Sequence, residues 1–479
     1  MGPTRRELLG MAAGALAAPA APAPERWNLL LITCDQNRAD ALGCMGNPVL
    51  RTPNIDRLAS QGALFENWFV QCPQCVPSRS ALHTGRYPHT NRTPSNLYQL
   101  PPEEETLATA LGRHGYLTAC AGELPFAPTK FLGGFQQVVS SDAEYHANLE
   151  AAGWRGANVS AARRRLLEEH DARGKRQFQA SPVPWPEDLD ETAFHAGKAI
   201  EFLKANRERP FFLHVNFRRP HHPFDPPAPF DRLYQGARFP ASHQRAGEMD
   251  NKPPGQRKAV ESSVGFDLRT MTAADLDRIK AYSYGMISEN DKYIGRMLDE
   301  MKAIGLEDHT IVVVTADHGE MLGDHGLLFK GGYMYDEVVH APCIVRAPGR
   351  VPAGKRWNPL VEEIDLMPTL LELMGIEGSP RMQGRSLAPL MDGKSLASRP
   401  VHAEFSNIKM LRTRDWKLVH YLRAPYGELY NLREDPHELY NRYDDPGAAR
   451  ARHEMESATI DWLIDSEDPA RQPLQAEKR

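Results

Sequence analysis

The chain has 479 residues, of which 41% are hydrophobic and 25% are charged. This is enough for one large hydrophobic core with a smaller companion domain, and the composition excludes a disordered or fibrous protein. The 57 basic and 62 acidic residues are spread along the chain without the basic clusters that follow a phosphate backbone, so nucleic acid is not expected as a partner.

The N-terminus has the pattern of a twin-arginine export signal. Arg5 and Arg6 precede a short apolar stretch, residues 10–18, and small residues and prolines follow it. We therefore predict that residues 1–24 direct export to the bacterial periplasm or beyond. The stretch is too short to cross a bilayer and no later apolar run reaches about 18 residues, so no transmembrane span is expected.

Strands alternate with helices through most of the chain. Strands are expected at residues 27–33, 117–121, 210–216 and 310–315, and helices at residues 52–59, 105–114, 190–205 and 272–304. The strands are continuous apolar runs, which is typical of strands covered on both faces of a parallel sheet. We expect an α/β domain over residues 25–392, with a mostly parallel central sheet flanked by helices. Residues 140–186 are charged and irregular, and we interpret them as a variable insertion.

The pattern changes after residue 392. Two short strands with alternating side chains, residues 409–413 and 416–421, lie on either side of a turn, and residues 451–465 are expected to form a closing helix. A smaller C-terminal antiparallel sheet plus a helix is therefore predicted for residues 393–479.

Polar residues come directly after two of the expected buried strands. Asp35 and Gln36 end the first strand, and Asp317 and His318 follow the strand at 310–315. In α/β sheets the carboxyl ends of parallel strands meet at one edge, where ligands bind. Polar residues at the end of such strands are therefore candidates to line a site.

The most specific motif is CVPSRSALHTGR, which runs from Cys75 to Arg86. It closely resembles the signature of the formylglycine-dependent sulfatase family, except that His83 stands where the family usually has an aliphatic residue. The resemblance implies an alkaline phosphatase-like fold, oxidation of Cys75 by a formylglycine-generating enzyme, and hydrolysis of the sulfate ester of a sulfated sugar or small organic sulfate. A formylglycine hydrate carries two hydroxyls on one carbon: one attacks sulfur, and the other later expels sulfate by reforming the aldehyde.

The resemblance also implies roles for residues outside the motif. One divalent cation would be held by Asp35, Gln36, Asp317 and His318. Arg79 would hold the formylglycine hydroxyl and the metal ligands, and Lys330 would contact a sulfate oxygen. His221 would protonate the leaving alcohol, with His222 as an alternate. Hard oxygen ligands with one imidazole suit calcium, with magnesium or manganese as alternatives, and zinc is not expected because the sequence has no compact set of histidines.

The resemblance breaks at Glu123. Many family members have Gly-Lys-x-His after the third strand, whereas this chain has Gly-Glu-Leu-Pro there. Phosphonate monoester hydrolases, which are relatives with the same nucleophile, also lack that Lys-His pair and carry an Asn at the place of Asn96. Three alternatives remain: Glu123 recognises a cationic or hydroxyl-rich substrate group, the substrate is a phosphonate monoester or phosphodiester, or the chain is a catalytically silent binder of sulfated glycans. Lys130 is a candidate replacement cation.

Cys72 and Cys75 also form a Cys-x-x-Cys pair. We do not favour a redox site, because a thioredoxin-like pair is followed directly by a helix and Pro77 argues against a helix here. Six cysteines are also too few and too scattered for a disulfide scaffold. Cys72 is expected to pack near the site.

Overall fold

The computed structural model describes residues 26–126, 131–154, 180–263 and 267–467. The predicted export signal and Lys130 lie outside the described residues, as does the middle of the predicted insertion. No helix in the described part of the chain is long and apolar enough to cross a membrane.

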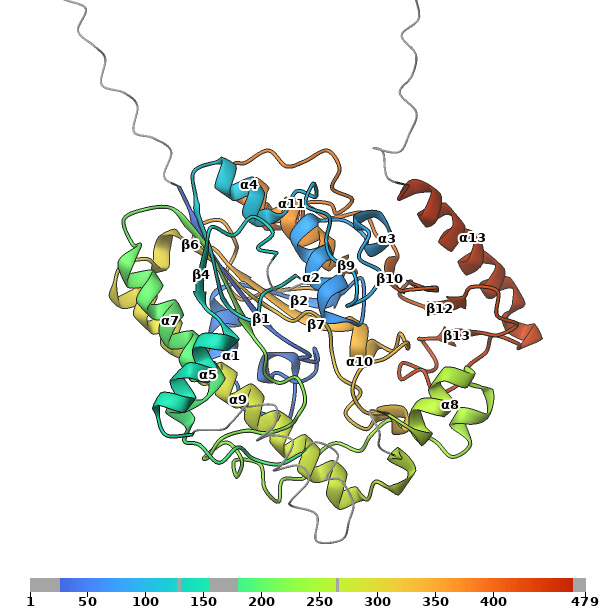
Figure 1. Cartoon of the computed structure of the whole chain (residues 1–479). Coiled ribbons are helices and arrows are strands. Elements are labelled where there is room, and N and C mark those ends of the chain that lie inside the picture. Colours follow the sequence, from blue (N-terminus) through green and yellow to red (C-terminus); the bar gives the residue numbers. More distant parts are fainter. Residues whose placement is uncertain (1–25, 127–130, 155–179, 264–266, 468–479) are drawn as a thin grey trace, which may run out of the picture.

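One large, mostly parallel sheet forms the centre of the fold (Figure 1). Its strands in spatial order are β4 (Gln137–Ser140), β3 (Leu117–Gly122), β5 (Phe211–Phe217), β1 (Asn28–Cys34), β6 (Thr310–Thr315), β7 (His340–Arg346), β2 (Ala63–Phe69) and β8 (Lys355–Trp357), and β9 (Val361–Glu362) also pairs with β2. Only β7 runs antiparallel to its neighbours among the described strands of this sheet. The expected parallel core is confirmed for β3, β5, β1 and β6.

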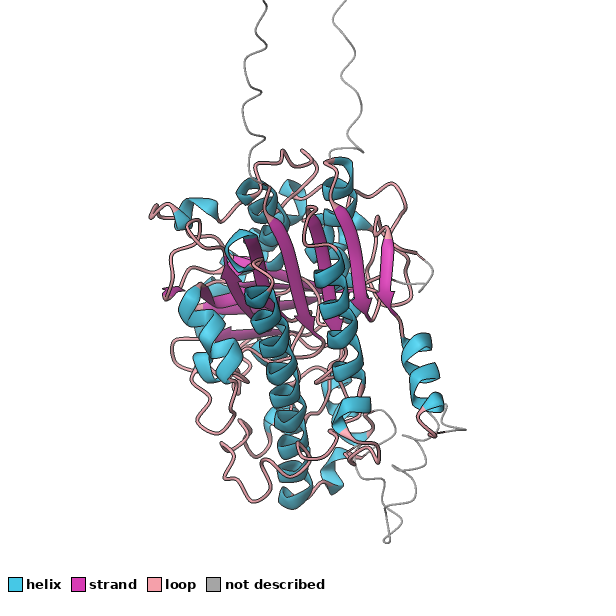
Figure 2. Ribbon diagram, turned by 90° about the vertical axis from the view of Figure 1, so that its left-hand side faces the viewer, coloured by secondary structure: helices cyan, strands magenta, loops and turns pink. Residues whose placement is uncertain are grey.

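Helices cover both faces of this sheet, and Figure 2 shows the row that lies over one of them. One face carries α1 (Pro53–Gln61), α7 (Glu191–Ala205) and α9 (Ala273–Ala303); the other carries α2 (Cys75–Thr84), α4 (Leu107–Arg113) and α11 (Leu366–Leu373). Strand β1 shows why both faces need cover: Leu29 and Leu31 pack into one core, and Leu30 and Ile32 into the other. Successive side chains of a strand point to opposite faces, so an unbroken apolar strand needs helices on both sides.

Shorter helices complete the main body. They are α3 (Pro88–Asn91), α5 (Asp142–Ala151), α8 (Pro254–Glu261), α10 (Asp336–Val339) and α12 (Ala388–Met391). Helix α5 lies in the stretch interpreted as an insertion and begins with a capping box, in which Ser141 and Glu144 satisfy each other's backbone N–H groups.

The predicted C-terminal antiparallel sheet with a helix is confirmed. Its strands are β10 (Val401–Phe405), β11 (Ile408–Arg412), β12 (Trp416–Tyr421) and β13 (Gly427–Asn431), and α13 (Ala449–Asp465) packs on β11 and β12. Leu411, Leu418, Leu429 and Met455 form a small core between sheet and helix. Figure 1 shows this part beside the main sheet, next to α8.

Strands β2 and β7 and helix α2 are among the elements that sequence analysis did not predict. Strand β2 is interrupted by a bulge between Phe65 and Trp68, so its polar residues break the apolar pattern. Strand β7 contains Pro342, a residue that disfavours a strand. Helix α2 begins at Cys75, and the argument that Pro77 prevents a helix there was wrong: Pro77 lies in the first turn, where no backbone N–H is needed.

Candidate active site

The carboxyl ends of four neighbouring parallel strands bring the candidate residues together. Asp35 follows β1 directly, Glu123 follows β3, Arg218 follows β5, and Asp317 lies two residues beyond β6. Because these strands are adjacent and parallel, all four residues reach the same edge of the sheet.

Helix α2 presents two residues of the signature motif to this edge. Cys75 is its first residue and Arg79 comes four residues later, so both lie on one face of the helix. Cys75 is 8% exposed and Arg79 is 1% exposed. Ser78 fastens the helix to the strand end, because its hydroxyl donates to the backbone oxygen of Asp317 and lies 2.8 Å from Glu363 Oε1.

Four of the converging side chains form a candidate metal centre. Ligand atoms of Asp35, Cys75, Asp317 and His318 all lie within 4.8 Å of one another. His318 Nε2 is 3.5 Å from Asp35 Oδ1 and 3.7 Å from Asp317 Oδ1. His318 Nδ1 is 2.9 Å from the backbone oxygen of Gly319 and donates to it, which leaves the Nε2 lone pair available to a cation.

Gln36 supplies a further oxygen next to this centre. It adopts a left-handed conformation, with φ of 68°, in which its backbone N–H donates to Asp317 Oδ1 at 3.0 Å. Its side-chain nitrogen contacts Glu320 and lies 3.1 Å from His222 Nδ1. Its Oε1 is buried and has no hydrogen-bond partner within the described ranges. A buried carbonyl oxygen without a donor is a suitable cation ligand, so this donor set fits a divalent cation.

Arg79 pairs with three carboxylates around the centre. Its guanidinium donates to Asp317 Oδ2 at 2.9 Å, to Asp35 Oδ2 at 2.6 Å and to Glu123 Oε2 at 3.1 Å. Glu123, the carboxylate that departs from the family pattern, is therefore paired with a cation, which weakens its repulsion of an anionic substrate. Burial raises the pKa of Glu123 and Arg79 opposes that rise. The Glu123 side chain keeps 38% of its surface exposed, so it remains accessible to a ligand.

Lys330, which lies in the segment between β6 and α10, contacts the candidate nucleophile. Its Nζ lies 2.8 Å from Cys75 Sγ, 2.9 Å from His318 Nε2 and 3.8 Å from Asp35 Oδ1. Burial alone would raise the pKa of Asp35, but the positive charge of Lys330 and its other cationic neighbours holds that pKa well below its ordinary value. The site therefore contains an ionised carboxylate and an ammonium group in contact.

The environment of the two cysteines argues against a redox pair. Burial, followed by the charge of Asp35, raises the pKa of the Cys75 thiol to about 12. Burial also raises the pKa of Cys72 well above its ordinary value, and Cys72 is completely buried. Reactive redox thiols need a lowered pKa, so neither cysteine has the required environment.

The two adjacent histidines lie on a loop beside the centre. Their rings stack with centroids 4.1 Å apart, and His222 contacts Gln36 as described above. His221 Nδ1 lies 2.5 Å from the backbone oxygen of His222, which fixes the ring by one nitrogen. Both side chains are partly exposed, so the other faces of the rings are open to a ligand.

A buried ion cluster holds this histidine loop in place. Arg219, which is 1% exposed, pairs with Asp190 at 2.7 Å, Asp225 at 2.9 Å and Glu289 at 3.1 Å. Its backbone oxygen accepts a hydrogen bond from Asn290 Nδ2 at 2.6 Å. The cluster therefore ties the loop to helices α7 and α9.

Asn96 lies at the start of the signature helix. Its side-chain oxygen accepts a hydrogen bond from the backbone N–H of Val76 at 3.1 Å, and its own N–H donates to Gln74 Oε1 at 3.2 Å. The first N–H groups of a helix lack partners inside the helix, so Asn96 satisfies one of them. The structure thus places Asn96 beside the residue that follows Cys75, on the exposed side of the helix start.

Sequence analysis missed two residues of the site. Arg218 is half-buried; burial raises the pKa of Glu123 and lowers the pKa values of His221 and His222, and the positive charge of Arg218 opposes the first shift and adds to the other two. Its position directly after strand β5 was the available signal. Glu363, which holds Ser78, lies 285 residues away from it in the chain, and no local pattern marks that pairing.

The unusual His83 belongs to a buried hydrogen-bonded chain beneath the site. Its Nε2 faces His214 Nδ1 at 3.3 Å, and His214 Nε2 faces the Thr33 hydroxyl at 2.9 Å. Thr33 donates to Asn216 at 2.6 Å, and Asn216 donates to the backbone oxygen of Glu123 at 2.8 Å. His83 therefore has a structural reason to replace an aliphatic residue.

The buried His83 makes the stability of the protein sensitive to acid. Burial, helped by Arg79, lowers the pKa of His83 to about 3, whereas an unfolded chain would titrate near 6.5. As the pH falls below about 6.5 the unfolded state takes up a proton that the native state refuses, so stability is lost down to a pH of about 3. His83→Leu is expected to lower the free energy of unfolding by about 1–3 kcal/mol at pH 7, because the buried His214 Nδ1 loses its hydrogen-bond partner.

At pH 5 the difference in the free energy of unfolding between this variant and the original protein should be about 2 kcal/mol smaller than at pH 7. The variant lacks the histidine whose pKa is lowered by folding, so it does not lose that stability on acidification. Urea unfolding at both pH values measures it. His420→Leu, which alters an exposed histidine of β12, is the matched control and should leave the pH dependence unchanged. If the difference in the free energy of unfolding is the same at both pH values, His83 is not neutral and buried in the native protein.

A buried candidate nucleophile, two aspartates, an imidazole and an ammonium group at the carboxyl edge of a mostly parallel sheet define a hydrolase of the alkaline phosphatase-like class. The sulfatase family matches residues 27–376, and the family of N-sulphoglucosamine sulphohydrolase C-terminal regions matches residues 323–463. The chain belongs to the sulfatase family and is a sulfuric ester hydrolase, whose family members use formylglycine and a metal ion.

Similar proteins span nearly the whole chain. An arylsulfatase of Clostridium perfringens is 28% identical, with 85% of this chain and 88% of the relative covered. A multifunctional alkaline phosphatase superfamily protein of Trinickia caryophylli is also 28% identical, with 92% and 96% covered. The crystal structure of a phosphonate monoester hydrolase of Agrobacterium radiobacter superposes with a TM-score of 0.83 at 28% identity, covering 92% of this chain and 96% of that one. These comparisons confirm the expected fold and family.

Proposed function

We propose that this sulfatase cleaves the sulfate ester of a sulfated sugar or small organic sulfate with a formylglycine made from Cys75. One observation carries the proposal: Cys75 Sγ lies within 3.8 Å of Lys330 Nζ, His318 Nε2 and Asp35 Oδ1. A nucleophile on that carbon would meet an ammonium group suited to an anionic oxygen on one side and candidate metal ligands on the other.

The proposed metal ligands are Asp35, Gln36, Asp317 and His318. Three of them supply hard oxygens and one an imidazole nitrogen, a combination that favours calcium over zinc. When bound, such a cation withdraws electron density from a sulfate oxygen and from the formylglycine hydroxyl. Arg79 holds the outer oxygens of both aspartates, which orients their other oxygens inward.

The remaining residues act directly on the substrate in this proposal. Lys330 binds a sulfate oxygen through its ammonium group, and His221 donates a proton to the leaving alcohol, with His222 as the alternate donor. Glu123 and Arg218 lie at the edge of the site and contact the substrate beyond the sulfate. Asn96 is proposed as a further substrate contact beside the start of α2.

Burial constrains when the nucleophile can be made. Cys75 is 8% exposed and lies under Lys330 and His318, so an enzyme that oxidises it has no access in the folded protein. We propose that a formylglycine-generating enzyme acts on the chain before it folds. Export by residues 1–24 would follow this step.

A second candidate is the hydrolysis of phosphonate monoesters or phosphodiesters with the same nucleophile. It is supported by Asn96, by Glu123 in place of the Lys-His pair, and by the similarity to the phosphonate monoester hydrolase structure. A phosphoryl group carries charge on the same kind of oxygens, so Lys330 would serve it equally.

The test compares a sulfate ester with a phosphonate ester that share one aryl leaving group, using protein co-produced with a formylglycine-generating enzyme. We expect kcat/KM for the sulfate to exceed that for the phosphonate by about 10-fold or more, a transition-state difference of about 1.4 kcal/mol. The reverse preference would establish the second candidate. Affinity for sulfated glycans without turnover of either ester, in protein that carries the aldehyde, would overturn both in favour of a silent binder.

A further inference from the structure

Three segments far apart in the sequence place two histidines and a glutamate together outside the active site. His243 lies in a loop, Glu337 belongs to α10, and His437 lies beyond β13 in the C-terminal part. One nitrogen from each histidine and one oxygen of Glu337 all lie within 4.8 Å of one another. The active-site cluster contains none of these three residues.

Two of the three residues of this cluster have a buried polar atom without a hydrogen bond among the described residues. Glu337 has a side chain only 8% exposed, and its Oε2 has no hydrogen-bond partner among the described residues. His243 Nδ1 is also buried and without a hydrogen bond in that part of the chain. A buried polar atom left without a partner costs about 1–3 kcal/mol, so such atoms indicate an additional ligand.

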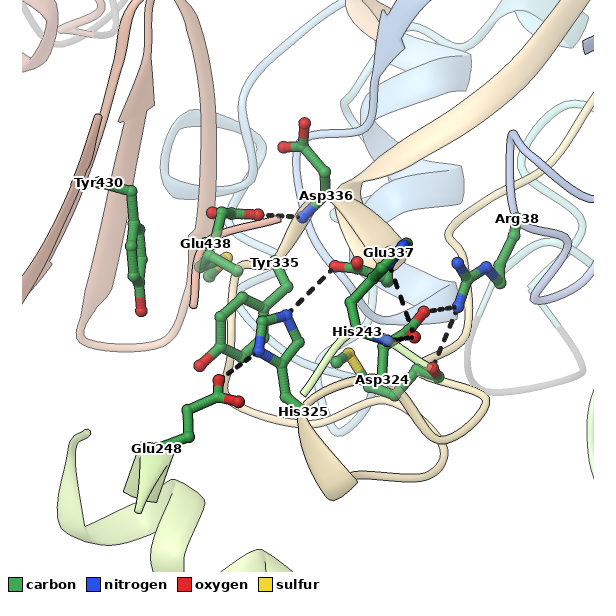
Figure 3. Close-up of polar contacts among 12 residues, drawn as sticks. Arg38, His243, Glu248, Asp324, His325, Tyr335, Asp336, Glu337, Tyr430 and Glu438 are labelled. Carbon is green, nitrogen blue, oxygen red and sulfur yellow. Dashed lines mark hydrogen bonds and ion pairs between the residues drawn. The ribbon is translucent and has the colours of Figure 1, made fainter. Parts of the chain in front are cut away.

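Neighbouring charged groups do not replace that ligand. The closest cation to Glu337 Oε2 that the structure pairs with it is His325 Nε2 at 3.8 Å, which is too long for a hydrogen bond, and His325 already contacts Glu248 at 2.5 Å. His243 Nδ1 lies 3.7 Å from Asp324 Oδ1, which is too long for a hydrogen bond; that oxygen accepts from the backbone N–H of His243 at 2.7 Å, and Arg38 holds the other oxygen of Asp324 at 2.7 Å. Figure 3 shows these pairs around Glu337 and His243.

The two histidines of the cluster contact each other face to face. The rings of His243 and His437 stack with centroids 3.5 Å apart and planes 19° apart. Stacked rings do not form a hydrogen bond to each other, so the nitrogen atoms stay available. His437 is exposed and can rotate toward a shared ligand, whereas Glu337 is fixed by burial.

We propose that His243, Glu337 and His437 form a second metal site that binds a transition-metal ion such as Zn²⁺, with water completing the coordination. Two imidazole nitrogens and one carboxylate oxygen are the ligands zinc takes in three-residue protein sites. The ligand atoms around a tetrahedral zinc ion lie about 3.3 Å apart, so the distances between the three ligand atoms have to shorten by at most about 1.5 Å. Rotation of His437 supplies that movement.

The site would connect the C-terminal sheet to the catalytic edge of the main sheet. The backbone oxygens of Glu337 and Val338 accept hydrogen bonds from Glu320 at 3.0 Å and Gly319 at 2.9 Å, directly after His318. A metal that joins α10 to His437 therefore fixes the segment that carries a catalytic metal ligand. The proposed role is structural, because none of the three residues touches Cys75.

The experiment measures zinc bound by the full-length protein after removal of metals and dialysis against zinc with excess calcium, which protects the catalytic cluster. The original protein is expected to bind one more zinc ion than His437→Ala, and zinc should raise the melting temperature of the original protein only. Cobalt serves as a second probe. The visible absorption of tetrahedral cobalt should appear with the original protein and should be absent from both His243→Ala and His437→Ala. Removal of one ligand should weaken the affinity by at least about 100-fold.

His420→Ala is the matched control, because it removes an exposed histidine of β12 outside the cluster. This variant should keep the zinc, and His437→Ala should keep its sulfatase turnover, which separates the second site from the active site. Equal zinc content in the original protein and in His437→Ala would overturn the proposal. Loss of the zinc in Asp317→Ala but not in His437→Ala would also overturn it, by placing the ion in the catalytic cluster.

Discussion

Cys75→Ala is expected to lower kcat/KM for a sulfate ester by at least about 10⁴-fold, because the substitution removes the nucleophile while the surrounding charges remain. The remaining groups still bind an anionic substrate, so KM should change far less than kcat. Steady-state hydrolysis of an aryl sulfate measures both constants. Cys44→Ala makes the same change at a half-buried cysteine outside the cluster and should retain full activity.

Cys75→Ser provides a sharper form of this prediction. A serine hydroxyl can attack sulfur once, but it has no second hydroxyl on the same carbon to expel sulfate. The variant should therefore stop with sulfate bound to the introduced serine, which mass spectrometry of the peptide detects, whereas the same peptide of the active protein should carry an aldehyde. Full activity of Cys75→Ala, or an unmodified thiol in fully active protein, would end the formylglycine proposal.

Arg219→Met is expected to lower the free energy of unfolding by about 3–5 kcal/mol. The substitution leaves Asp190, Asp225 and Glu289 in a buried space without their shared cation, and an unpaired buried charge is far more costly than a missing pair. Chemical unfolding measures the loss. Arg232→Met is the matched control, because Arg232 is 75% exposed and its pairing with Asp231 contributes at most about 1 kcal/mol.

The same variant should also reduce turnover, because Arg219 anchors the loop of His221 and His222. A positioning role predicts a fall in kcat beyond the fraction of protein that is unfolded, measured well below the melting temperature. If activity falls only in proportion to the folded fraction, Arg219 stabilises the protein without positioning the histidines.

The structure explains how the site accommodates Glu123 where many relatives have a lysine. Together with Asp35 and Asp317 it surrounds one guanidinium, and Arg218 adds positive charge at the outer side. The site therefore balances its extra carboxylate with arginines instead of using the Lys-His pair of many relatives. Recognition of substrate groups beyond the sulfate is proposed to reside in this pair of Glu123 and Arg218.

Local sequence determined much of the main body. Apolar runs identified β1, β3, β5 and β6, and the helices predicted at residues 272–304 and 190–205 correspond to α9 and α7, which the structure shows to be capped by Thr272 and Asp190. The signature motif identified Cys75 and Arg79 because their chemistry depends on residues adjacent in the chain. Asp35 and Asp317 were found because polar residues directly follow buried parallel strands.

Only the tertiary structure decided which distant groups meet. Strand β7 was not predicted because Pro342 disfavours a strand, although β7 pairs antiparallel with β6, and the pairing of Glu123 with Arg79 joins residues 44 positions apart in the chain. The cluster of His243, Glu337 and His437 has no sequence signal at all, since its members lie about 100 residues apart. Residue spacing reports neighbours along one element, whereas long-range contacts are set by packing between elements, and the charge balance of both sites arises from that packing.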